Sequence, residues 1–109
     1  MNWIDVCHLD DLDLDRGVCA LVGSQQVAVF RVSPDGGLHA LANRDPFSGA
    51  SVLSRGIVGS KGDVLKVASP MFKQSFDLRT GQCLDDSTVA VETFPIRAVE
   101  GRVQVALEA

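Results

Sequence analysis

The chain has 109 residues, of which 46% are hydrophobic, and its formal net charge at pH 7 is −4. This length accommodates one hydrophobic core, so we expect residues 1–109 to form a single domain. The apolar runs are far shorter than the about 20 residues of a membrane-spanning helix, and the acidic balance argues against nucleic acid or an anionic membrane as partner, because clustered Lys and Arg bind both.

The N-terminal third of the chain contains short apolar runs separated by turn signals. Residues 1–5 show no basic stretch followed by an apolar core, so the sequence predicts no secretory signal. Trp3–Val6 is predicted as a first strand. The acidic segment His8–Asp15 is interpreted as a surface loop, with a short helical turn as the alternative. Gly17–Val22 and Gln26–Val32 are rich in β-formers and flank a Gly-Ser-Gln turn, which is typical of a hairpin.

The middle of the chain continues the same pattern of strands and turns. Ser33–Gly37 is predicted to turn, because Pro fixes φ and Gly permits positive φ. Leu38–Ala42, Val64–Ala68 and Ser75–Leu78 are the next predicted strands. Residues 48–62 are rich in Gly and Ser, so we expect irregular structure there with one or two short strands.

The C-terminal part predicts a closing hairpin. Cys83-Leu84 is expected to pair as a short return strand. Residues 88–99 and 102–107 flank Glu100-Gly101, a two-residue connection of the kind found in tight hairpins. Pro95 interrupts the first of these runs, so the strand there is an edge strand or begins after it. Many short strands at this spacing predict an all-β fold, a small antiparallel sandwich or barrel.

Two loop motifs stand out, Asn43–Gly49 and Ser69–Gln74. Each follows a short apolar run and contains a Pro that the interior of a sheet would not accept. The motifs N-R-D-P-F-S-G-A, S-R-G-I-V, S-P-M-F-K-Q and F-D-L-R-T-G, in this order and spacing, resemble the small subunit of the cytoplasmic NAD(P)H-dependent nitrite reductase. The N-terminal W-x-x-V-C and the closing hairpin fit the same pattern, so the resemblance spans almost the whole chain.

This resemblance implies a Rieske-like β fold and a partner. The partner is the large subunit, which in this family carries FAD, an iron–sulfur cluster and sirohaem, uses NAD(P)H, and reduces nitrite to ammonium. It also implies a cytoplasmic location, which agrees with three widely spaced Cys and no C-x-x-C motif.

The ligand positions of a Rieske cluster can be placed on the two loops. A Rieske domain holds its two-iron cluster with two Cys and two His, in the loop patterns C-x-H and C-x-x-H. These positions fall on Asn43, Asp45, Ser69 and Phe72, none of which is Cys or His. We therefore expect a chain with no cluster, no metal and no catalytic residue of its own.

The space left between the loops requires an occupant, because lost volume destabilises a packed interior. Phe47, Met71 and Phe72 are expected to fill it. Arg44, Arg55 and Lys73 lie in or near the loops of an acidic protein, so we interpret them, together with Phe47, as a docking surface for the large subunit.

Two other functions stay open at this stage. One is a Rieske-type ferredoxin, which the missing Cys and His disfavour, and the other is a free-standing β interaction module. Cys7 and Cys19 lie in or beside predicted strands and are expected to be small buried hydrophobes. His8 borders the acidic segment, where pairing with an Asp is expected. The serines of the loops lack the G-x-S-x-G motif of a nucleophile.

Overall fold

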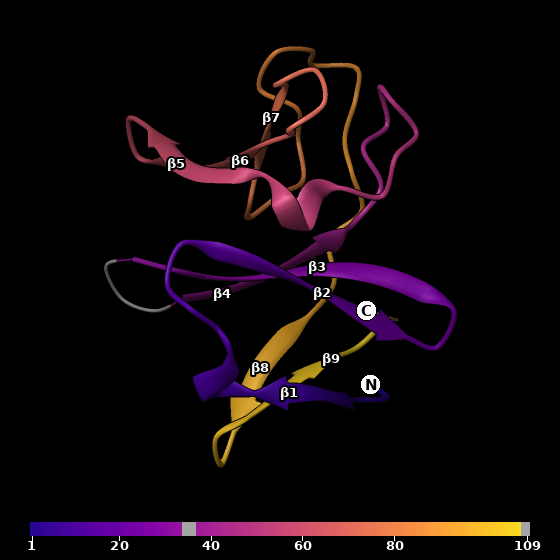
Figure 1. Cartoon of the computed structure of the whole chain (residues 1–109), viewed down its shortest axis with the longest axis vertical. Helices are drawn as coiled ribbons and strands as arrows, with labels where there is room; N and C mark the ends of the chain where they lie inside the picture. The colour runs from indigo at the N-terminus through magenta and orange to yellow at the C-terminus, as the bar shows by residue number, and fades with distance from the viewer. Residues whose placement is uncertain (34–36, 108–109) are drawn as a thin grey trace.

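The computed structural model describes residues 1–33 and 37–107, and its strands form three small antiparallel sheets (Figure 1). The lower sheet has the order β1-β9-β8, with bounds β1 Ile4–His8, β8 Ile96–Val99 and β9 Arg102–Val105. The middle sheet has the order β2-β3-β4, with bounds β2 Arg16–Val22, β3 Gln25–Val32 and β4 Gly37–Ala42. The upper sheet has the order β5-β6-β7, with bounds β5 Ile57–Lys61, β6 Val64–Ala68 and β7 Ser75–Asp77. The predicted all-β antiparallel class is confirmed.

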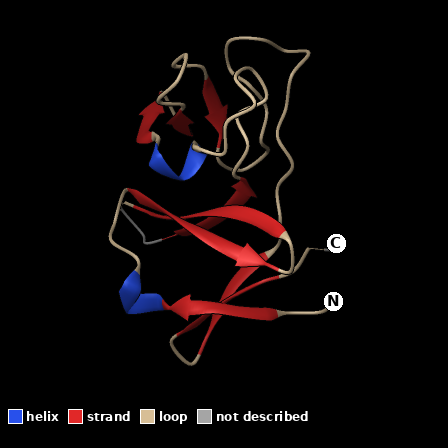
Figure 2. Cartoon of the chain, turned by 45° about the vertical axis from the view of Figure 1, so that its right-hand side comes forward, coloured by secondary structure: helices blue, strands red, loops and turns tan. Residues whose placement is uncertain are grey.

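The middle sheet lies between the other two layers (Figures 1 and 2). Its central strand β3 is buried on both faces, which explains its near-continuous apolar sequence. Because side chains alternate across a strand, Val27 and Val29 contribute to one cluster of buried residues while Ala28 and Phe30 contribute to the other.

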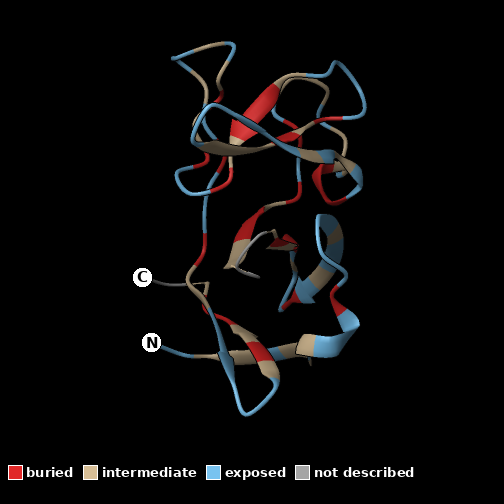
Figure 3. Cartoon of the chain, turned by 90° about the vertical axis from the view of Figure 1, so that its left-hand side faces the viewer, coloured by how far each residue is buried: buried red, intermediate tan, exposed pale blue. Residues whose placement is uncertain are grey.

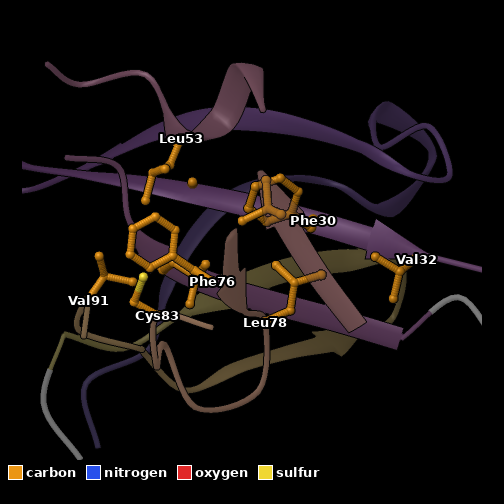
Figure 4. Close-up of a cluster of buried hydrophobic side chains, with 10 residues drawn as sticks. Phe30, Val32, Leu53, Phe76, Leu78, Cys83 and Val91 are labelled. Carbon is orange, nitrogen blue, oxygen red and sulfur yellow. The ribbon is translucent and has the colours of Figure 1, made fainter. Parts of the chain in front are cut away.

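Two hydrophobic clusters result from this arrangement. The lower cluster joins β3 to the sheet of β1, β8 and β9 through Val103 and Val105, both fully buried. The upper cluster joins β3 to the lobe that carries the two loop motifs, and Figure 4 shows Phe30, Leu53, Phe76 and other side chains meeting there from separate segments. Burial is concentrated inside these layers, whereas much of the surface of the turns is exposed (Figure 3). The upper cluster therefore anchors the loop-bearing lobe to the rest of the molecule.

The strand predictions agree with the structure to within one or two residues for most elements. The acidic segment contains a short 3-10 turn, η1 (Leu9–Asp11), and residues 48–62 contain η2 (Leu53–Arg55) and β5. The long run 88–99 is not one strand, because β8 begins only after Pro95, and Cys83 forms an isolated bridge to Phe76. The turn predicted at Ser33–Gly37 includes residues 34–36, which lie outside the described residues.

The connection between β8 and β9 confirms the predicted tight hairpin. Val99 pairs with Arg102, which leaves Glu100 and Gly101 as the connecting residues. Both have positive φ, 50° and 78°, as a type I′ turn requires. Within the described part of the chain, no helix is long and apolar enough to cross a membrane.

A substitution at Gly17 tests the packing of the middle sheet against η2. A Cβ built on Gly17 would lie 2.3 Å from the carbonyl oxygen of Ser54 and 2.6 Å from Cε1 of Phe30. We expect Gly17→Ala to lower the free energy of unfolding by about 1–3 kcal/mol, because the contacts must move apart. Urea denaturation measures this. Gly59→Ala is the matched control, since its Cβ would meet nothing within 4 Å, and an equal loss in both variants would contradict the packing described.

Candidate functional site

The first loop leaves the end of β4 and closes on itself. The backbone N–H of Asp45 donates to the carbonyl of Ala50 at 2.8 Å, and that of Gly49 donates to the carbonyl of Asp45 at 2.7 Å. Gly49 has a φ of 77°, a conformation that suits Gly, and a Cβ there would lie 3.3 Å from Nη2 of Arg44. The guanidinium of Arg44 therefore lies over the backbone of its own loop.

The second loop is the hairpin connection between β6 and β7. The N–H of Ser69 donates to the carbonyl of Gln74 at 2.9 Å, and the N–H of Lys73 donates to the carbonyl of Ser69 at 3.0 Å. The hydroxyl of Ser69 also accepts the N–H of Met71 at 3.3 Å. Lys73 has a positive φ of 64°. These bonds fix residues 70–73 as a short outward arch.

A direct hydrogen bond joins the two loops. The hydroxyl of Ser69 donates to Oδ2 of Asp45 at 2.5 Å, and both residues are almost completely buried. Oδ1 of Asp45 accepts the backbone N–H of Phe47 at 2.8 Å and that of Ser48 at 3.4 Å. Burial raises the pKa of the Asp45 carboxyl, but the bonds from Ser69, Phe47 and Ser48 outweigh it and hold the pKa below its ordinary value.

Asn43 ties the first loop to its surroundings in the same way. Its Oδ1 accepts the backbone N–H of Ser54 at 2.7 Å, and its Nδ2 donates to the carbonyl of Ser51 at 3.1 Å. Nδ2 also donates to Oε1 of Gln26 at 3.2 Å. Asn43 is only 1% exposed, so its polar atoms need these partners.

The residues at the four ligand positions do not fit a Rieske cluster. Such a cluster needs thiolate or imidazole donors, and Asn43, Asp45 and Ser69 offer only oxygen and amide groups that other protein groups already engage. Phe72 offers no donor and is 59% exposed. Among the described residues, no group of three or more His, Cys, Asp or Glu is placed to hold a metal ion.

The expectation that three apolar side chains fill the space between the loops is only partly correct. Phe47 is half-buried and packs against the upper cluster, its ring centroid 6.2 Å from that of Phe76. Met71 and Phe72, however, are 50% and 59% exposed. The direct bond between Asp45 and Ser69 brings the loops together, so the side chains of the outward arch remain in solvent.

The predicted cationic residues all lie on the surface of the loop-bearing lobe. Arg44 and Lys73 are exposed on the two loops that the Asp45–Ser69 bond joins. Arg55 is exposed at the end of η2 and, with Arg16, lines a surface hollow of about 320 Å³. The next residue, Gly56, packs so closely that a Cβ would lie 2.4 Å from the carbonyl oxygen of Ala68. Arg55 is therefore near the start of the second loop.

The structure corrects the expectation for Cys19 and bears out those for Cys7 and His8 in part. Cys19 is exposed, Cys7 is half-buried and packs against the lower cluster, and Cys83 is buried in the upper one. Burial and the nearby Asp11 raise the pKa of the Cys7 thiol, against a lowering effect of Arg102. The ring of His8 contacts Nη1 of Arg102 at 2.9 Å, and the expected pairing with an Asp is made by the backbone N–H of His8, which donates to Oδ2 of Asp11 at 3.1 Å.

Removing the hydroxyl of Ser69 tests the bond between the loops. Ser69→Ala leaves Oδ2 of Asp45 buried without this donor, and we expect a loss of about 1–3 kcal/mol in the free energy of unfolding. Chemical denaturation measures the loss. Ser87→Ala, at an exposed serine, is the control, and a Ser69→Ala variant as stable as this control would refute the role of the bond.

The stability of the protein at acidic pH tests the contribution of the Asp45 carboxylate. Its folded pKa lies below the about 3.9 of an unfolded chain, so its contribution is complete above the unfolded value and is lost as the pH falls through the folded value. We expect the stability of Asp45→Asn to change less than that of the wild type between about pH 5 and about pH 2. Asp13→Asn, at an exposed carboxylate outside the two loops, is the control. Parallel profiles for wild type and Asp45→Asn would show that the Asp45 carboxylate does not stabilise the fold.

Comparison with known proteins identifies the family of this fold and its loops. The model of the Rieske-like [2Fe-2S] domain family matches residues 2–106. The nitrite reductase (NADH) small subunit of Escherichia coli K12 is 43% identical over 104 residues, which cover 95% of this chain and 96% of that protein. A crystal structure from Mycobacterium tuberculosis, described as a candidate NADH-dependent nitrite reductase small subunit, superposes with a TM-score of 0.94 at 50% identity, covering 99% of this chain and 96% of that one.

A larger protein contains a region similar to the whole domain. The nitrite reductase [NAD(P)H] large subunit of Klebsiella oxytoca is 38% identical over 103 residues, which cover 94% of this chain but 11% of that protein. This match and the near full-length matches to small subunits agree with the resemblance found in the loop motifs. The chain belongs to the Rieske-like domain family, as a homologue of the nitrite reductase small subunits.

Proposed function

We propose that this chain is a cluster-free small subunit of a cytoplasmic NAD(P)H-dependent nitrite reductase, and that it docks on the large subunit and supports reduction of nitrite to ammonium there. The observation that carries the proposal is the state of the ligand positions. Within a Rieske-like fold, Asn43, Asp45 and Ser69 are buried and hydrogen-bonded to the protein itself. These bonds support the proposal that the loops keep their structure without iron.

The role of a supporting subunit follows from the chemistry that the loops offer. A Rieske cluster transfers electrons, and the residues present at its ligand positions supply neither thiolate nor imidazole. FAD, sirohaem and the iron–sulfur cluster then belong to the large subunit, as the family resemblance implies. This chain then contributes a surface that binds the large subunit, and no cofactor.

Partnership with the large subunit is supported by the Klebsiella oxytoca protein. There, a region 38% identical to this chain is part of the polypeptide that is described as the large subunit. Two units that occur in one polypeptide are held at a high effective concentration. We infer that the separate chain meets the same partner through a non-covalent interface.

The docking surface that we propose includes Arg44, Phe47, Arg55 and Lys73. The three cations are exposed on one lobe of an acidic protein, and no ion pair to any of them is recorded within residues 1–33 and 37–107. Unpaired cations at one end suit an acidic face on the partner and speed association. Phe47 supports this surface from beneath, through its contact with Phe76.

Reconstitution with the large subunit tests the proposed function. We expect nitrite-dependent NAD(P)H oxidation by the large subunit to increase when this chain is added, and we expect the purified chain to contain no stoichiometric iron. Absorbance at 340 nm follows the reaction, and elemental analysis measures the iron. Stoichiometric iron with a Rieske-type visible spectrum would refute a cluster-free subunit, and an unchanged rate with no co-purification would refute the subunit assignment.

Charge reversal tests the cationic part of the surface. We expect the double variant Arg44→Glu, Lys73→Glu to bind the large subunit at least about tenfold more weakly, mainly through slower association at low salt. Biolayer interferometry at several salt concentrations measures this. Lys61→Glu is the control, because it reverses an exposed cation at the C-terminal end of β5, away from the second loop. Equal association by wild type and the double variant would exclude Arg44 and Lys73 from the interface.

A further inference from the structure

Large apolar side chains are exposed around the second loop. Met71 is 50% exposed, Phe72 is 59% exposed, and Ile57, on the edge strand β5, is 77% exposed. Ile57 pairs with Ala68, the residue that directly precedes the loop. The three residues therefore belong to one region of the upper lobe, which we call the apolar tip. Exposed apolar residues that gather in this way mark interaction sites on many proteins.

The backbone beneath the apolar tip is rigidly held. Ser69 receives or donates four of the hydrogen bonds that define the loop, including the bond to Asp45. Lys73 keeps a positive φ, and Pro70 fixes its own φ at the start of the arch. Met71 and Phe72 are thus presented in solvent by a loop that loses little backbone entropy on binding, which favours affinity.

Three cations lie next to the residues of the apolar tip in the sequence or on the neighbouring loop. Lys73 follows Phe72 directly, Arg55 lies two residues before Ile57, and Arg44 is on the neighbouring loop. All three are exposed. An aromatic and aliphatic centre with a charged rim is the usual composition of an energetic hot spot in a protein interface.

The position of the tip suits contact with the rest of a large subunit. The first and last strands, β1 and β9, pair through Ile4 and Val105 in the lower sheet, at the end of the molecule away from the loops (Figure 1). In a longer polypeptide that contains a similar region, a covalent connection through these strands would leave the tip accessible.

We propose that Phe72 and Met71, with Ile57 beside them, are the anchor by which this chain binds the large subunit, inserting into an apolar pocket with an acidic rim. This inference rests on the proposed function and adds to it the residues that supply most of the affinity. The cations then steer the approach, while the apolar tip determines how long the complex lasts.

Truncation of the anchor is the experiment that tests this proposal. We expect the double variant Met71→Ala, Phe72→Ala to raise the Kd for the large subunit at least about tenfold, chiefly through faster dissociation. Phe72→Trp should keep affinity within about threefold of the wild type, since an aromatic anchor remains. Calorimetry and interferometry measure both. Val99→Ala truncates an apolar residue of 41% exposure at the opposite hairpin and is the control.

Thermal unfolding shows whether each variant is folded; these side chains are largely exposed, so the midpoint should not change. If the wild type does not bind the large subunit, the proposed function itself fails. If the wild type binds and the double variant binds equally well, only the anchor proposal fails. A wild-type chain that dimerises by itself, and a double variant that does not, would assign the apolar tip to a second copy of the chain and overturn the proposal.

Discussion

The hydrogen bond between Ser69 and Asp45 is the interaction on which the loop-bearing end of this protein depends. It connects a loop that follows the middle sheet to the hairpin of the upper sheet, across 24 positions of sequence. Both groups are buried, so the bond operates where water cannot replace either partner. The same carboxylate accepts two backbone N–H groups of its own loop. One side chain therefore orders the first loop and attaches it to the second.

This bond gives a physical reason for a Rieske-like fold whose predicted ligand positions hold other residues. In a domain with a cluster, the metal crosslinks the two loops, and simple loss of its ligands would leave them unattached. Here a hydroxyl and a carboxylate provide the crosslink, and Asn43 provides a second attachment through Ser54 and Gln26. The loops therefore keep their place in the fold. The side chains of Met71 and Phe72, which lie between the bonded ends of the second loop, remain exposed on the surface.

Much of this fold was predictable because its signals are local. The alternation of Val103 and Val105, the positive-φ pair Glu100-Gly101 and the β-rich runs around Gly23 each act within a few residues of sequence. The family resemblance predicted in addition that the two loops lie together. The exposure of Phe72 was predicted incorrectly, because it depends on a contact between distant residues, Asp45 and Ser69, and on the closure of the hairpin. The hydrogen bonds of Asn43 to Gln26 and Ser54 were likewise invisible to any local pattern.

The pKa of the Asp45 carboxyl is the most direct test of the central claim. Carbon-13 NMR of the side-chain carboxyl, followed through an acid titration, measures it in the wild type and in Ser69→Ala. We predict a pKa below the ordinary value of about 3.9 for Asp in the wild type, and a higher pKa once the Ser69 hydroxyl is removed. An unperturbed Asp45 in the wild type, or one that does not respond to Ser69→Ala, would contradict the claim that this bond joins the loops.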